Sequence, residues 1–201
     1  GSRVGLIARL VQQLNARLFE RAWQLIAPPE LVANSCLFVM GSEGRGEQLL
    51  KTDQDNGLVL REGYAPPADL AEICARFSEA LGQFGYPPCP GGIMLSNPAW
   101  RRSVPDFVAT LRQWVWQPDS DNLMHLAIFM DAHAVAGDAK LLAQVSDSLH
   151  FLNWIEKTGF TVSQVIDTAQ GTVKAFWSFA DPASEGGHRS SMFVEGRFRF
   201  R

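Results

Sequence analysis

Two acidic residues, Asp53 and Asp55, stand between two apolar runs, and this arrangement restricts the fold more than any other part of the sequence. The runs, residues 36–40 and 58–60, are short and apolar, which predicts two buried strands. Residues two apart on an extended strand project to the same face. We therefore expect the two carboxylates to converge, while Gln54 between them points the other way and braces the sheet.

A metal and a phosphate could both bind in this stretch. Two like charges held so close repel each other unless a cation lies between them, and carboxylate oxygens together with substrate phosphates are a common way of holding Mg²⁺. Gly41 and Ser42 follow the first strand and predict a tight turn, with Ser42 as the N-cap of a short helix over residues 44–50. The free N–H groups at such a helix start suit a phosphate. The sequence thus predicts a nucleotide and metal site within residues 41–60.

Residues 41–56 read Gly-Ser-Glu-Gly-Arg-x-Glu-Gln-x-Leu-x-Thr-Asp-Gln-Asp-Asn. This string resembles a nucleotidyltransferase domain of undefined function in the polymerase-β-like superfamily. That domain is related to the N-terminal region of the PII-protein uridylyltransferases and often stands beside CBS or cyclic-nucleotide-binding modules in bacteria. The resemblance extends over roughly residues 4–150.

The resemblance implies roles for several of these residues. Asp53 and Asp55 would hold Mg²⁺ or Mn²⁺, and Gly41 and Ser42 would bind the nucleotide phosphates. Arg45 is a candidate phosphate contact; a salt bridge to a neighbouring glutamate is almost as good an interpretation.

Residues 85–101 form a second unusual stretch, which resembles the family segment Gly-Tyr-Pro-x-Cys-x-Gly-Gly-Val-Met-Ala-x-Asn-Pro-x-Trp. We expect a rigid proline-rich loop and then a short strand over residues 93–95. Ser96, Asn97 and Arg101 are candidate nucleotide contacts. The alternative, that they only build the turn, remains equally open, and we expect Trp100 to lie in the core.

Asp131 is the candidate for a third carboxylate. It ends the apolar run at residues 126–130, which predicts a buried strand, and an acid so placed is costly unless it is paired, solvated or bound to metal. In the polymerase-β-like family a third carboxylate on a neighbouring strand helps to activate the attacking hydroxyl; a purely structural role for Asp131 is the alternative. His133 stands where the family usually has arginine, and an imidazole cannot hold a phosphate in the bidentate manner of a guanidinium.

Composition narrows the class of protein. The chain has 201 residues, 46% of them hydrophobic, and a net charge of −3, which is ample for a packed core and gives no basic surplus for nucleic acid. Its three cysteines are widely spaced and predict neither a disulfide framework nor a zinc site. No apolar run approaches the roughly 20 residues that a membrane span needs. We expect a cytoplasmic protein.

The predicted fold is α/β, a small mixed sheet flanked by helices. We expect an N-terminal helix in residues 1–30, a nucleotidyltransferase-like domain in residues 31–150, and in residues 151–201 the start of a helical C-terminal region that is cut short. Further helices are expected over residues 69–84, from about 103 to 117, over 137–156 and over 160–179.

The expected function is metal-dependent transfer of a nucleoside monophosphate from a nucleoside triphosphate, such as ATP or UTP, to a hydroxyl of a protein or small molecule. The setting implied by the resemblance is a bacterial signalling protein with regulatory modules. The alternative is an inactive nucleotide-sensing module, which His133 favours and the intact acid pair opposes.

Overall fold

A computed structural model describes residues 3–40, 53–117, 119–148, 160–167, 173–180 and 189–196. The chain divides into two compact units, each treated by itself below. The first comprises Gly1–Thr110 and Asp131–Val145, and the second comprises Leu111–Met130 and Ser146–Arg201.

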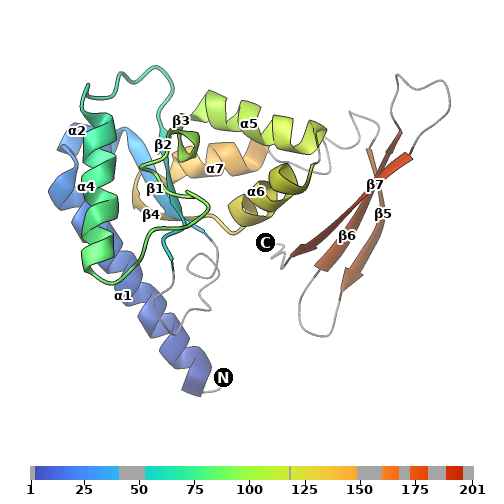
Figure 1. Ribbon diagram of the computed structural model, residues 1–201, viewed down its shortest axis with the longest axis horizontal. Helices are drawn as coiled ribbons and strands as arrows, with labels where there is room; N and C mark the ends of the chain where they lie inside the picture. The colour runs from blue at the N-terminus through green and yellow to red at the C-terminus, as the bar shows by residue number, and fades with distance from the viewer. Residues whose placement is uncertain are drawn as a thin grey trace. The chain divides into compact units, whose positions relative to one another are not determined.

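The first unit is built on a four-stranded sheet with the strand order β3-β2-β1-β4 (Figure 1). Antiparallel pairs join β1 to β2 and to β4, whereas β2 and β3 are parallel, so the sheet is mixed, as predicted. The strands are β1 (Ser35–Val39), β2 (Asn56–Leu60), β3 (Arg101–Ser103) and β4 (His133–Gly137).

Helices cover both faces of this sheet, which explains why every residue of β1 and β2 is buried. On one face, Leu37 and Val39 join the core with α1 (Arg3–Ile26), α2 (Pro29–Ala33) and α4 (Leu70–Gln83). On the other face, Phe38 meets Phe107 of α5 (Val104–Trp116) with ring centroids 5.9 Å apart. Cys36 there lies beside the backbone of α7 (Ala139–Ser148).

The predicted N-terminal helix is confirmed as α1, and its C-terminal half carries the core contacts. Phe19 packs edge-on against Tyr86, and Trp23 packs edge-on against Phe77 of α4. Trp23 is fully buried, so α1 is anchored to the domain by this half.

Two predicted strands are wrong. The apolar run at residues 126–130 belongs to helix α6 (Ser120–Met130), and residues 93–95 form no strand. The remaining strands of the sheet are β3, after the short 3₁₀ helix η1 (Pro98–Trp100), and β4, which begins after Asp131. A short apolar run can be a buried strand or a buried stretch of helix, and periodicity alone does not separate the two.

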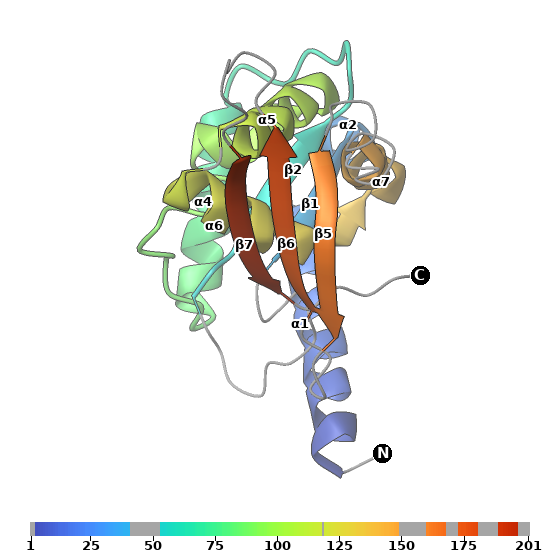
Figure 2. The ribbon, with the colours of Figure 1, turned by 90° about the vertical axis from the view of Figure 1, so that its right-hand side faces the viewer.

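The helix predicted over residues 160–179 is also wrong. The second unit there contains an antiparallel sheet of β5 (Phe160–Asp167), β6 (Val173–Ala180) and β7 (Arg189–Gly196), which lie side by side in Figure 2. The described residues beyond 160 are thus strands, where a helical C-terminal region was expected. The proposed boundaries at residues 30 and 150 stay predictions.

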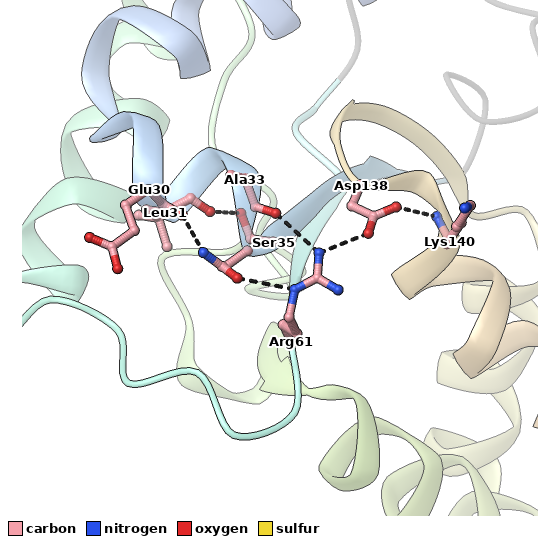
Figure 3. A network of polar contacts seen from close by, with 8 residues as sticks. Glu30, Leu31, Ala33, Ser35, Arg61, Asp138 and Lys140 are labelled. Carbon is pink, nitrogen blue, oxygen red and sulfur yellow. Dashed lines mark hydrogen bonds and ion pairs between the residues drawn. The ribbon is translucent and has the colours of Figure 1, made fainter.

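A polar network around Arg61 ties together the ends of three strands in the first unit (Figure 3). Arg61 is the residue after β2. Its guanidinium donates to Asp138 Oδ2 (2.8 Å), to the Ala33 carbonyl (3.2 Å) and to Asn34 Oδ1 (3.0 Å). Asp138 follows β4 and also accepts from the Lys140 amide at 3.1 Å. The hydrogen bond from Arg61 is the main reason why the pKa of Asp138 lies below its ordinary value of 3.8.

We expect Asp138→Asn to lower the free energy of unfolding at pH 7 by about 1 kcal/mol, no more, because both partners are partly exposed and solvent screens them. A carboxylate with a lowered folded pKa stabilises the fold above its unfolded value and loses this contribution as the pH falls through the folded one. The difference between wild type and variant should therefore shrink below about pH 4. Urea unfolding of wild type and variant at pH 7 and below about pH 4 measures this difference. An undiminished difference at the lower pH would contradict its ionic origin.

Candidate active site

The segment before β2 presents its two acids on one side. Asp53 is exposed, Gln54 is buried and Asp55 is half-buried, an alternation that ends at β2, where every residue is buried. The Gln54 side-chain amide donates to the carbonyls of Ser78 (2.9 Å) and Tyr86 (2.8 Å). Its backbone N–H donates to the Pro87 carbonyl at 2.9 Å. The prediction that Gln54 points away from the acids is confirmed, but its partners lie on α4 and in the loop after it and not on the sheet that it was expected to brace.

Asp55 is held at the end of the β1–β2 ladder. Its carbonyl accepts from the Met40 amide at 2.9 Å, one step beyond the Val39–Asn56 pair. Burial raises the pKa of the Asp55 carboxyl, the nearby charge of Asp53 raises it further, and a hydrogen bond with Cys89 opposes both. The Asp55 carboxylate is therefore less stable in its charged form than a solvated one, and an added cation would favour ionisation.

Asp131 lies at the same end of the sheet. It occupies the turn between α6 and β4 and is half-buried. Val39 of β1 is paired on one side with Asn56 and on the other with His133, so Asp55 and Asp131 each stand just before the strands that flank the end of β1. However, the described residues include no group of three or more His, Cys, Asp or Glu side chains arranged to hold a metal ion. The structure thus places Asp53 and Asp55 on one segment, and Asp131 just before the strand on the other side of β1.

His133 opens β4 and is exposed. It stands at the sheet end that carries the acids, the position at which the resemblance leads one to expect an arginine.

The loop after α4 is fixed directly beside the acid segment. The Asn56 backbone N–H donates to the Ile93 carbonyl at 3.1 Å, and the side-chain Oδ1 of Asn56 accepts from the Leu95 backbone N–H at 2.9 Å. Asn56 is only 2% exposed, so these bonds replace water that a buried strand end could not reach. Trp100 is buried, as predicted.

The three candidates in this loop have local partners. Asn97 caps η1, since its Oδ1 accepts from the Ala99 amide (3.0 Å), and its Nδ2 donates to the Gly92 carbonyl (2.9 Å). Arg101 Nη1 donates to the carbonyls of Leu95 (2.8 Å) and Ser96 (3.3 Å). These contacts build the turn, in line with the structural alternative, and nucleotide contact by Ser96, Asn97 or Arg101 stays a prediction.

Cys89 is a site neighbour that sequence reasoning missed. It is half-buried and hydrogen-bonded to the Asp55 carboxylate. Burial is the main cause of the raised pKa of its thiol, and the charge of Asp55 adds to it. Its position in a proline-rich loop after α4 was the available signal, but only the folded loop shows which carboxylate the thiol meets.

Three of the predicted phosphate-binding residues, Gly41, Ser42 and Arg45, lie outside the described residues.

A wide surface groove of about 670 Å³ is lined by Glu20, Gln24, Pro29, Val32, Ala33, Gly137 and Asp138. It lies at the opposite end of β4 from His133 and contains none of the candidate site residues.

Comparison with known proteins gives one family match. A family model described as "Putative nucleotidyltransferase DUF294" matches residues 1–121, which include the acid pair and the loop through Arg101 and end before Asp131. No curated protein matches the chain. Among the described helices, none is both long enough and apolar enough to cross a membrane.

Proposed function

The chain belongs to the DUF294 nucleotidyltransferase family, and from this premise we propose that it is a metal-dependent domain acting on a nucleoside triphosphate. It would transfer the nucleoside monophosphate to a hydroxyl group of a protein or small molecule. The observation that carries the proposal is the pair of carboxylates, Asp53 and Asp55, on one side of the segment that enters β2.

The donor set fits Mg²⁺ or Mn²⁺. Both acids offer hard oxygen ligands, one exposed and one half-buried, and the segment between them is anchored through Gln54. Burial is the main cause of the raised pKa of Asp55, and a cation beside the carboxylate would offset this cost of ionisation. Asp53 and Asp55 would hold the ion, which would neutralise charge on the triphosphate.

The protein groups would then mainly position the reactants. An acceptor hydroxyl would attack the α-phosphorus, the bond from that phosphorus to the bridging oxygen would break, and pyrophosphate would leave. Asp131 would take the hydroxyl proton. Gly41, Ser42 and Arg45 would bind the phosphates.

Titration calorimetry with ATP, UTP, CTP and GTP tests the proposal. We expect one triphosphate to bind only with Mg²⁺, and Asp53→Asn/Asp55→Asn to weaken that binding about 100-fold, because two ionised ligands are removed. A control with the same change in charge is Glu79→Gln/Asp147→Asn, since both of these acids are exposed and lie on α4 and α7. Equal loss in the two double variants, or no binding by folded wild type, would refute the proposal.

A second candidate, nucleotide sensing without transfer, is favoured by His133, which is exposed at the start of β4. An imidazole is a weaker phosphate clamp than a guanidinium. Pyrophosphate release separates the two candidates: binding without release of pyrophosphate in the presence of varied acceptors supports sensing. The proposed function includes an acceptor hydroxyl on a protein or small molecule, and regulatory modules that control the domain.

A further inference from the structure

Helix α1 exposes a run of large apolar side chains. Among the large apolar residues that are exposed in the described part of the chain, most lie on this helix: Leu6 54%, Ile7 52%, Leu10 50%, Leu14 69% and Leu25 69%. The N-terminal half of α1 extends past the strands of the first unit and past α4 in both views (Figures 1 and 2). A cluster of exposed apolar groups of this kind marks an interaction surface.

The exposed residues follow a heptad pattern. Ile7, Leu10, Leu14, Arg17 and Arg21 are separated by alternating steps of three and four, and all five are exposed. We call these five residues the α1 seam. Steps of three and four keep side chains in one line along a helix, and such a line packs against a second helix by knobs into holes.

The seam is distinct from the face that α1 uses inside its own domain. Phe19, Ala22 and Trp23 are buried in the core, whereas Arg21 between them is exposed. Packing a partner on the seam therefore requires no rearrangement of the fold.

Charge selects the partner. The exposed Arg9, Arg17 and Arg21 outnumber the single acid of α1, Glu20. Arg17 reaches Glu20 only at 3.5 Å and its side chain is 83% exposed, so its charge stays available to a partner. A surface of this kind attracts acidic side chains.

A second copy of the chain fits poorly. Parallel pairing would set Arg17 against Arg17 and Arg21 against Arg21, and antiparallel pairing with Leu10 facing Leu14 would set Ile7 against Arg17. The parallel register brings like charges together, and the antiparallel register sets a charged guanidinium against an apolar side chain, so both registers oppose association. A lipid surface fits less well too, because two guanidinium groups lie in line with the leucines and would have to enter the apolar layer.

We propose that the α1 seam docks an acidic amphipathic helix, with leucine-like side chains against Ile7, Leu10 and Leu14 and carboxylates against Arg17 and Arg21. This surface is independent of the proposed nucleotide site.

The test uses the whole chain and two synthetic heptad peptides with leucine at a and d. One carries glutamate at e and g, and the matched peptide carries lysine there. Fluorescence anisotropy should show binding of the glutamate peptide only. Leu10→Glu/Leu14→Glu should weaken it at least about tenfold. Leu25 is as exposed as Leu14 but lies outside the seam, so Leu25→Glu should leave binding within about twofold.

Reversing the charge of Arg17 and Arg21 is the more discriminating experiment. Arg17→Glu/Arg21→Glu should transfer the preference to the lysine peptide while circular dichroism shows an unchanged fold. Equal binding of both peptides, or no effect of the seam variants, would overturn the proposal. So would binding to phosphatidylglycerol vesicles in place of the peptide, or a wild-type dimer in sedimentation that Leu10→Glu/Leu14→Glu abolishes, because these outcomes assign the seam to lipid or to a second copy.

Discussion

Replacing Gly137 with alanine should destabilise the protein by about 4 kcal/mol or more, a large share of the roughly 5–15 kcal/mol that keeps a domain folded. A Cβ at this position would lie 2.1 Å from the Ser35 carbonyl oxygen and 2.9 Å from the Val32 carbonyl oxygen. Both obstacles are backbone atoms, so no side chain can rotate away. Gly137 also has a φ of 81°, which side chains with a Cβ rarely adopt.

The backbone around Gly137 cannot shift at low cost. Gly137 is paired with Cys36 across the β1–β4 ladder, and the next amide, that of Asp138, donates to the same Ser35 carbonyl at 2.9 Å. Moving the chain to admit a methyl group would break this junction and disturb the Asp138–Arg61 contact.

Gly63→Ala is the matched control for this substitution. Gly63 has a similar φ of 75°, but no atom of the described residues lies within 4 Å of its added Cβ. The Gly63→Ala variant should lose only about 1 kcal/mol of stability, which is the cost of holding a residue with a Cβ at a positive φ. Denaturant unfolding followed by circular dichroism compares the two variants, and equal midpoints would show that the clash at Gly137 is relieved in some other way.

The sequence is enough to predict the elements whose patterns are long or doubly constrained. The amphipathic helices α1 and α4 follow from their apolar periodicity, and β1 and β2 follow from apolar runs on either side of a turn and an acid pair. The orientation of Gln54 against its two neighbours follows from strand geometry alone.

Helix α6 shows where such reasoning stops. Its final residues are as apolar as a central strand, but the deciding information lies upstream, where Asp119 Oδ1 accepts from the Asn122 amide at 2.8 Å. An acid in that position is an N-cap signal for the helix that follows, and it outweighs the local apolar run. Once α6 occupies these residues, β4 takes the edge of the sheet and Asp131 becomes a turn residue.

Contacts that depend on loop conformation cannot be predicted from spacing. Asp55 and Cys89 are far apart in the sequence and meet only because Gln54 and Asn56 bind the backbone of the intervening loop. A helix was also expected from the mixed patterning of residues 160–179. The strands β5 and β6 form there instead, by pairing with each other. Strand pairing is a long-range effect that local propensity does not contain.

Gln54→Leu should have the second large effect, on both stability and the proposed cation site. Gln54 is 3% exposed, and leucine of similar size would delete its hydrogen bonds to the Ser78 and Tyr86 carbonyls. We expect a loss of about 3 kcal/mol, because buried carbonyls would then lack these donors. The segment with Asp53 and Asp55 would lose its anchor to α4, so Mg²⁺-dependent triphosphate binding should weaken as well.

Two controls separate these causes. Gln83→Leu changes the same residue type at an exposed position at the end of α4 and should leave unfolding and binding unchanged. Ser78→Ala keeps the Ser78 carbonyl and removes a buried hydroxyl that has no hydrogen-bond partner among the described residues, so it should cost little. Calorimetry and urea unfolding on the three variants give both readouts. If Gln54→Leu unfolds like Gln83→Leu, Gln54 does not anchor the acids; if only its stability falls, the pair keeps its geometry without the anchor.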